Sequence, residues 1–349
     1  MGGPALEAAG LRVVAPMESV AMMGFAEVVA HLPAIRRARR SLQHLFEERA
    51  DAVFLPIDAP GLHLGLARAA KRMGRRVVYY VCPQVWAWDY KRVRRLREDV
   101  DLVLPLFRFE EELLAREQIP ARWVGHPVGG LRPDPSLSER ARHSFGIGSG
   151  EILLALLPGS RKGEVRRLVG PMLDAASRLV AQSDVRIRVA VSDAGHLDEA
   201  IARGAARAVW EVVRPIRWSG EARELLRSAD FAAVASGTAT LETAALGVPM
   251  VIVYRTGWLN YQIARRLVRV PQIGLANLVA GRAAAPELIQ GAAEGPAIAA
   301  ALARLMTDPA ARESQRAAFS RLPEILGGEG ASDRAAQALI DFVAAGEGA

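Results

Sequence analysis

Two segments of the chain place glycine and small hydroxyl residues between a strand-like run and a helix-like run, a pattern suited to binding phosphate. The first, LLALLPGSRKGEV at residues 153–165, carries Gly159, Ser160 and Arg161 after an apolar run. Gly159 permits close backbone approach, the helix N-terminus offers free N–H groups, and Arg161 can bind a phosphate at two points. An ordinary strand–helix turn with a surface arginine is an equally good interpretation of this segment alone.

The second segment, ASGTATLETAALGVPMVIVYR at residues 235–255, repeats the pattern. Ser236, Gly237 and Thr238 open a helix whose N-terminus can hold a diphosphate, and Glu242 on its first turns can bond ribose hydroxyls. N-capping by the hydroxyl residues, with a glutamate that complements the helix dipole, is the alternative. Two such turns in one half of the chain favour binding of a nucleoside diphosphate.

Other candidate residues lie in the first half. Asp58, in the run VFLPIDAP, lies at the carboxyl edge of an expected strand. A carboxylate there can act as general base on a sugar hydroxyl, although an aspartate that caps the following helix is the commoner arrangement. Trp86 and Trp88 suit stacking on a sugar or an acyl chain, with core packing as the alternative for at least one of them. His126, in VGHP, follows another strand, and a lone histidine is usually structural.

Two stretches combine apolar or aromatic side chains with arginines, as surfaces that contact anionic membranes do. An amphipathic helix that covers the core is the more frequent reason for such a pattern. The residues concerned are Phe25, Val28, Val29, Leu32 and Ile35 in the first stretch, and Trp258, Tyr261, Arg265, Arg266 and Arg269 in the second.

The composition narrows the class of protein. A chain of 349 residues with 51% hydrophobic and 24% charged residues suits two packed globular domains. Its single cysteine, Cys82, excludes a disulfide scaffold, and no signal peptide or apolar run of roughly 18 residues is evident. The net charge of +7 favours phosphorylated ligands or anionic lipid over nucleic acid. The sequence shows no metal-ligand spacing, GxGxxG, Walker loop or GxSxG elbow, which weakens the metalloenzyme, dehydrogenase, kinase and hydrolase alternatives.

Short β-type runs alternate with helical periodicity along most of the chain. The expected strands are residues 11–15, 52–57, 76–81, 102–105, 122–124, 152–157, 185–191, 231–234 and 250–254. The expected helices include residues 62–73, 164–181, 221–227, 238–246 and 259–268. This alternation predicts an α/β protein with doubly wound parallel sheets. The Gly-, Pro- and Ser-rich stretch GGLRPDPSLS predicts an N-terminal domain at residues 1–130 and a C-terminal domain with a helical tail at residues 131–349.

Several strings together resemble one family, the lipid-A-disaccharide synthases. They are GGPALEAAGL, MMGFAEVV, IDAPGLHLGLA, YYVCPQVWAWDYKRV, VGHPV, LLALLPGSRKGEV, ASGTATLETAALGVPMVIVYR, LANLVAGR and PELIQ, in the family's order. The resemblance implies an inverting GT-B glycosyltransferase with two Rossmann-like domains, the first on the acceptor side and the second binding UDP-sugar. It would join UDP-2,3-diacylglucosamine to 2,3-diacylglucosamine 1-phosphate, giving the β-1,6 disaccharide 1-phosphate and UDP. Neither a metal nor a cofactor is expected.

The resemblance also assigns residues. The general base would be Asp58, the diphosphate ligand Arg161, and the ribose contact Glu242, while Trp86 and His126 are candidates on the acceptor side or in the cleft between the domains. The full expected UDP-sugar set is Gly159, Ser160, Arg161, Ser236, Gly237, Thr238, Glu242, Tyr254, Arg255 and Asn277.

The chain departs from the family pattern in places. The family begins with an apolar strand, an AGExSGD loop and a helix, whereas this chain begins at GGP, so the resemblance implies that this segment is missing. Smaller departures are Gly61-Leu62-His63 in place of DFN, Cys82 and Gln84 in place of serines, and Ala276 in place of the proline of LPN. They affect acceptor-side contacts more than UDP binding.

Acylated substrates would account for an apolar and basic surface on a protein without a membrane span. We therefore expect a cytoplasmic enzyme of lipopolysaccharide synthesis, peripherally bound to the inner membrane of a Gram-negative bacterium, and pairing as a homodimer. The alternatives are another UDP-sugar enzyme of GT-B fold, such as an epimerase or a different transferase, and a non-catalytic remnant that binds UDP-sugar. A nicotinamide dehydrogenase ranks last because it would need the glycine fingerprint.

Overall fold

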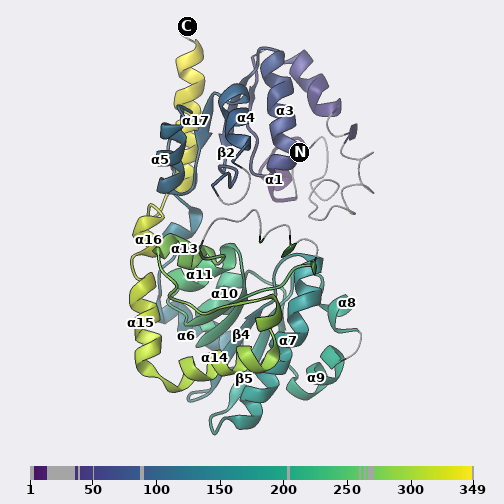
Figure 1. Cartoon of the computed structure of the whole chain (residues 1–349), viewed down its shortest axis with the longest axis vertical. Helices are drawn as coiled ribbons and strands as arrows, with labels where there is room; N and C mark the ends of the chain where they lie inside the picture. Colours follow the sequence, from purple (N-terminus) through teal and green to yellow (C-terminus); the bar gives the residue numbers. More distant parts are fainter. Residues whose placement is uncertain are drawn as a thin grey trace. The chain divides into compact units, whose positions relative to one another are not determined.

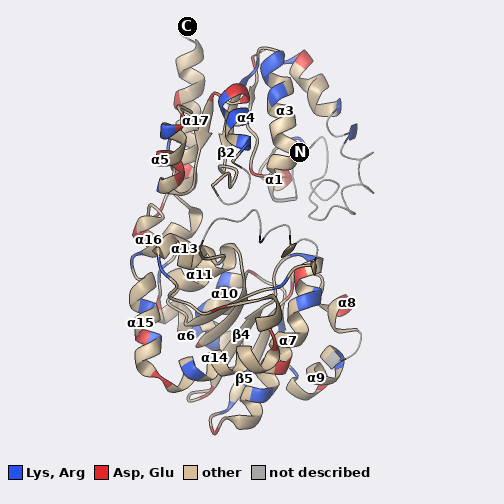
Figure 2. Cartoon of the chain, viewed as in Figure 1, with Lys and Arg blue, Asp and Glu red and all other residues tan. Residues whose placement is uncertain are grey.

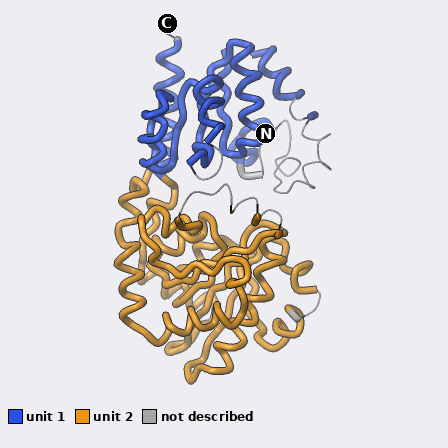
Figure 3. Tube along the Cα trace, in the orientation of Figure 1, with its two compact units in different colours: residues 1–125, 331–349 blue, residues 126–330 orange. Residues whose placement is uncertain are grey.

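The computed structural model describes residues 4–13, 36–37, 40–49, 51–86, 90–202, 205–258, 261–262, 265 and 271–347. The chain forms two compact units, shown in Figure 3: unit 1 comprises Met1–Gly125 and Ala331–Ala349, and unit 2 comprises His126–Gly330. The last helix therefore belongs with unit 1, and the prediction that the helical tail is part of the second domain is wrong for this helix. Within unit 1, Arg122 Nη1 lies 2.6 Å from a carboxylate oxygen of Asp341, and the Arg76 guanidinium lies 3.9 Å from the Phe342 ring centroid.

Unit 1 contains a three-stranded parallel sheet in the order β1-β2-β3. Its elements are α1 (Pro4–Ala8), β1 (Val53–Phe54), α3 (Pro60–Arg72), β2 (Arg76–Tyr80), α4 (Arg92–Asp99), β3 (Leu102–Leu104), α5 (Arg108–Arg116) and α17 (Ala331–Glu347). Helix α3 begins with a proline in its first turn and buries an apolar stripe that includes Leu64, Leu66 and Ala67. This stripe fixes α3 beside β2, and so fixes the turn that precedes the helix.

Unit 2 contains a six-stranded parallel sheet in the order β6-β5-β4-β7-β8-β9. Its elements (Figure 1) are η2 (Pro127–Gly130), α6 (Pro135–Ser144), β4 (Ile152–Leu157), α7 (Lys162–Gln182), β5 (Ile187–Ser192), α8 (Leu197–Ile201), α9 (Ala205–Val213), β6 (Ile216–Trp218), α10 (Ala222–Ser228), β7 (Phe231–Ala235), α11 (Thr238–Ala245), β8 (Met250–Tyr254), α13 (Leu275–Ala280), β9 (Glu287–Ile289), η3 (Gln290–Ala292), α14 (Gly295–Thr307), α15 (Pro309–Phe319) and α16 (Leu322–Ile325).

The sheet of unit 2 is covered on both faces, which explains why its central strands are continuous apolar runs. Leu154 and Leu156 of β4 belong to a core cluster with α7 and α14, whereas α10 and α11 contact β4 and β7 from the other face. All of Leu153–Leu156 is fully buried. The expected α/β class with parallel sheets is confirmed, and the layers position the carboxyl ends of β4, β7 and β8 next to one another.

Some expected elements are absent or lie elsewhere. Residues 122–124 form no strand, because the chain pairs with β3 only through a single bridge at Ala121. Residues 11–13 are also not in a strand, and residues 14–15 lie outside the described ones. The short strands β6 and β9 were not expected. Within the described part of the chain, no helix is both long and apolar enough to span a bilayer.

Candidate functional site

Asp58 lies in unit 1, directly after a bridge between Ile57 and Tyr80 that continues β1 along β2. Both Asp58 and Ala59 have left-handed backbones, with φ of 50° and 47°. For a residue other than glycine this conformation costs about 1–2 kcal/mol. The N-cap of α3 is Ala59, and no side chain caps this helix, so Asp58 does not have the capping role that its position in the sequence favoured.

The strained turn is held by hydrogen bonds to the backbone of Asp58. The Asp58 N–H donates to the Tyr80 carbonyl over 3.0 Å. The Asp58 carbonyl accepts from the Tyr79 hydroxyl at 2.8 Å and from His63 Nδ1 at 2.7 Å. The Asp58 side chain itself is exposed and makes no hydrogen bond or ion pair with any residue that the structure describes. The turn thus presents a carboxylate that remains available to a ligand.

Trp86 follows β2 and lies in an aromatic group with Phe107 and Phe109. Its Nε1 donates to a Glu110 carboxylate oxygen at 3.0 Å, and its ring meets Phe109 edge to face at 5.1 Å. Glu110 is 2% exposed, and this burial raises its pKa to about 7 even though its hydrogen bonds lower it. Trp86 is half-buried, so packing accounts for part of the ring. Trp88 lies outside the described residues.

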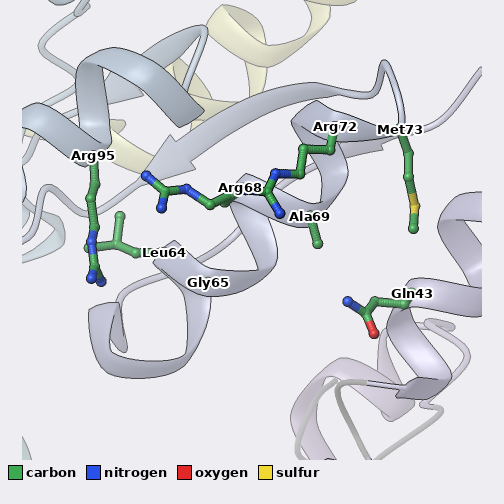
Figure 4. A pocket seen from close by; sticks show the side chains of 8 residues that line it. All are labelled: Gln43, Leu64, Gly65, Arg68, Ala69, Arg72, Met73 and Arg95. Carbon is green, nitrogen blue, oxygen red and sulfur yellow. The ribbon is translucent and has the colours of Figure 1, made fainter.

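The described part of unit 1 also has a cavity of about 330 Å³, which neither Asp58 nor Trp86 lines (Figure 4). Helices α3 and α4 supply Arg68, Arg72 and Arg95 to its wall, and Gln43 faces them from helical residues 40–48. Figure 2 shows the basic residues of α3 and α4. Arg68 is paired with Glu98 and Asp99. None of the expected site residues lines this cavity. It is therefore a basic surface feature that is separate from the Asp58 turn.

In unit 2 the turn between β4 and α7 contains Gly159 with φ of 108°. A Cβ atom at this position would lie 2.5 Å from a carboxylate oxygen of Glu164, so only glycine fits without displacement. Arg161 is the N-cap residue of α7, and its Nη1 lies 2.9 Å from Glu164 Oε1. Its side chain is 54% exposed. Ser160 beside it is also exposed.

The start of α11 follows β7, the neighbour of β4 in the sheet. Ser236 Oγ donates to the Ile273 carbonyl at 2.8 Å, and Gly237 is the N-cap of α11. Thr238, the first residue of the helix, is exposed. Glu242 is half-buried, and burial raises its pKa. The turns at Arg161 and at the start of α11 therefore lie at the carboxyl ends of adjacent parallel strands, where ligands of α/β sheets bind.

The remaining unit 2 candidates are tied to chain partners. Asn277 is fully buried, and its amide donates to the Ala285 carbonyl and to Glu287 Oε1 at 2.8 Å each. Its oxygen accepts from Ala284 and Ala285 N–H groups at 3.0 and 2.9 Å. These bonds use both donors and both acceptors of an asparagine amide, so Asn277 organises the loop before β9.

Tyr254 ends β8, the strand next to β7, and is half-buried. Arg255 follows it and is ion-paired with Glu294. His126 is buried, its Nδ1 accepts from the Val128 N–H at 3.1 Å, and burial lowers its pKa to about 4. The neutral, bonded ring of His126 fits the structural interpretation of this residue.

The sequence identifies His63 only as part of a departure from the family string DFN, and it gives Tyr79 and Glu110 no role at the site. Tyr79 lies inside a strand and is fully buried, so the apolar run around it predicts only that its ring packs in the core. His63 lies on the buried stripe of α3. Glu110 occupies the first turn of a helix, where a glutamate is common. No local signal reveals that these side chains meet the Asp58 and Trp86 segments.

The chain has relatives among known proteins. Residues 1–341 match the profile of the family described as lipid-A-disaccharide synthetase. A lipid-A-disaccharide synthase from Anaeromyxobacter dehalogenans (strain 2CP-1 / ATCC BAA-258) is 40% identical over 343 residues, covering 97% of this chain and 88% of the relative. One from Pseudomonas aeruginosa (strain LESB58) is 39% identical over 345 residues, covering 98% and 89%.

Two solved structures with similar folds have much lower sequence identity to this chain. A UDP-GlcNAc 2-epimerase from Neisseria meningitidis bound to UDP-GlcNAc has a TM-score of 0.62 at 12% identity, covering 96% of this chain and 87% of that one. A glycosyltransferase from Rickettsia africae ESF-5 has a TM-score of 0.55 at 12% identity, covering 98% and 88%. These likenesses support the GT-B fold, and at such identity they concern the fold alone.

Proposed function

The chain belongs to the lipid-A-disaccharide synthase family, and we propose that Asp58 is the general base of its glycosyl transfer. As a member of this family it is a glycosyltransferase of lipid A biosynthesis that takes a UDP-sugar donor and a lipid acceptor. The donor we propose is UDP-2,3-diacylglucosamine, and the acceptor is 2,3-diacylglucosamine 1-phosphate. The observation that carries the role of Asp58 is its exposed carboxylate, which has no partner among the residues that the structure describes, on a backbone turn fixed by buried side chains.

The chemistry requires a base and a stabilised leaving group. In an inverting transfer, Asp58 accepts the proton of the acceptor 6-hydroxyl as that oxygen bonds to the anomeric carbon. The bond from the anomeric carbon to UDP breaks in the same step, and negative charge grows on the diphosphate. The Arg161 guanidinium and the N–H groups at the start of α11 supply positive charge and hydrogen-bond donors for it.

The other unit 2 candidates have supporting roles in this proposal. Glu242 contacts the ribose hydroxyls, and Gly159 and Ser160 line the turn beside the diphosphate, as do Ser236 and Gly237. Tyr254 and Arg255 extend this set along the neighbouring strand β8. Asn277 acts indirectly, because its amide bonds are all made within the chain.

Asp58→Asn tests the proposal for the base. We expect disaccharide formation from the two acylated substrates to fall by at least about 10³-fold, within the range that general-base catalysis supplies. UDP affinity, measured by isothermal titration, should stay within twofold of the wild type, because unit 2 carries the diphosphate ligands. Turnover close to the wild-type rate would remove Asp58 as base, and equal loss of turnover and UDP affinity would do the same.

We also propose that the protein binds peripherally to the inner membrane and pairs as a homodimer. The acyl chains of both substrates and the net charge of +7 support an anionic bilayer as partner. Trp258 is 73% exposed, as expected of a membrane-contacting side chain. The first candidate stretch, with Phe25, Val28, Val29, Leu32 and Ile35, lies outside the described residues, as do Arg266 and Arg269.

Two measurements test these associations. Sedimentation with anionic and zwitterionic vesicles should show binding to the anionic ones, and Trp258→Ser should weaken it. Equal binding of the variant would exclude Trp258 as a contact. Light scattering of the purified chain gives its mass, and a monomer at micromolar concentration would contradict the homodimer.

A further inference from the structure

The backbone at Asp58 and Ala59 holds a left-handed conformation that alanine does not favour and that aspartate adopts only occasionally. Asp58 and Ala59 both lie in the left-handed region, and alanine has no side-chain group that could stabilise it there. Strained backbones of this kind persist only where the surroundings over-determine them, and they concentrate at functional sites. The neighbours of this turn must therefore hold it in place.

Two buried side chains converge on the same backbone oxygen. The Tyr79 hydroxyl, 2.8 Å away, and His63 Nδ1, 2.7 Å away, both donate to the Asp58 carbonyl. Tyr79 is completely buried and His63 is 8% exposed. Because a carbonyl only accepts, His63 must carry its proton on Nδ1. Burial lowers the pKa of His63, which favours the neutral ring, and the bond to the carbonyl sets its tautomer.

These two donors come from different elements. Tyr79 lies on strand β2, and His63 lies on the buried face of helix α3, one turn beyond the strained residues. The Asp58 carbonyl is therefore fixed from the sheet and from the helix at once. The Asp58 N–H is held as well, by the Tyr80 carbonyl at 3.0 Å. With the peptide planes on both sides of its Cα atom fixed, the direction of the Cα–Cβ bond that carries the carboxylate is fixed too.

We propose that Tyr79 and His63 are positioning residues for the transfer reaction, holding Asp58 in the left-handed turn that aims its carboxylate at the acceptor hydroxyl. This inference rests on the proposed role of Asp58 as base. Displacement of a reacting group by about 1 Å can cost on the order of 100-fold in rate. Loss of one of two donors leaves the other in place, so we expect a smaller effect from each single variant.

Variants of the full chain separate positioning from folding. Tyr79→Phe and His63→Leu remove one donor each and should lower kcat roughly 10-fold, with KM for both substrates and UDP affinity within about twofold. His63→Asn keeps a side-chain N–H donor and should recover most of the kcat that His63→Leu loses. Tyr80→Phe is the matched control. It leaves in place the Tyr80 backbone carbonyl that accepts from the Asp58 N–H and removes only a hydroxyl that makes no hydrogen bond within the described residues. The Tyr80 side chain also points to the other face of the strand from that of Tyr79. This control variant should retain wild-type kcat.

The outcomes distinguish this inference from the assignment of the base. Thermal unfolding and UDP affinity show whether each variant is folded, and kcat is expressed per folded protein. If Asp58→Asn is inactive while Tyr79→Phe and His63→Leu keep wild-type kcat, the positioning inference is overturned and the base assignment stands. An equal kcat loss in Tyr80→Phe, or loss of UDP affinity along with kcat, would also overturn it. If Asp58→Asn retains turnover, the base assignment fails, and the positioning role fails with it.

Discussion

The buried carboxyl of Glu110 should make the stability of unit 1 depend on pH. Its pKa is raised from 4.5 to about 7, chiefly because burial penalises the charged form. Between these values the folded chain keeps a proton that the unfolded chain has released. The contribution of the protonated Glu110 carboxyl to the free energy of unfolding is therefore fully present below pH 4.5 and is lost as the pH rises to about 7. At 1.36 kcal/mol per pKa unit, a shift of about 2.5 units corresponds to ~3 kcal/mol.

Glu110→Gln removes this titration and keeps an oxygen that can accept from Trp86 Nε1. We expect the free energy of unfolding of the variant, minus that of the wild type, to rise by ~3 kcal/mol from about pH 4.5 to 7.5. Urea unfolding at each pH, with hydrogen exchange of the β2 amides to follow unit 1, measures this difference. His126 in unit 2 titrates in the opposite sense, because its pKa is lowered to about 4, but it is common to both proteins and cancels. A difference that stays flat across this pH range would refute the argument that Glu110 is protonated because it is buried.

Two further predictions concern the turn between β4 and α7. Arg161→Ala should weaken UDP binding about 10-fold by titration calorimetry, since a charge-assisted bond contributes roughly 1.5–3 kcal/mol and part of that already goes to Glu164. Arg166→Ala, an exposed change on the same helix, is the control, and equal affinities for both variants would exclude Arg161 as a ligand. Gly159→Ala should lower stability by about 1–3 kcal/mol, because the backbone is left-handed and the new Cβ meets Glu164. An unchanged melting temperature would contradict that.

The sequence predicts the elements that are determined locally. Strands β4 and β8 match the expected residues 152–157 and 250–254, because each is a continuous apolar run between turn residues. The strands β6 and β9 have three residues each, too few for a periodic signal. Helix α17 has an apolar face, but an amphipathic pattern does not say which sheet it covers. Its place in unit 1 depends on partners such as Arg122.

The same distinction between local and long-range information separates the candidate site residues. Asn277 and His126 occur in motif-like strings, yet the structure shows their polar atoms bonded within the chain. Asp58 differs from them in both respects. Its position in the sequence favours a helix cap, yet its carboxylate has no partner among the described residues.

A polar side chain can bind a ligand only if its hydrogen-bonding groups are not already paired within the fold. Whether they are paired depends on residues far away in the sequence. Tyr79 lies 21 residues from Asp58 and yet holds its carbonyl. Residue type and spacing therefore nominate candidates, whereas the hydrogen-bond partners decide between a ligand and a scaffold. By that criterion Asp58 is the strongest candidate in unit 1. In unit 2 the guanidinium of the exposed Arg161 is already paired with Glu164, so a diphosphate must compete with that carboxylate for it. The UDP affinity of Arg161→Ala is therefore the measurement that decides the role of Arg161.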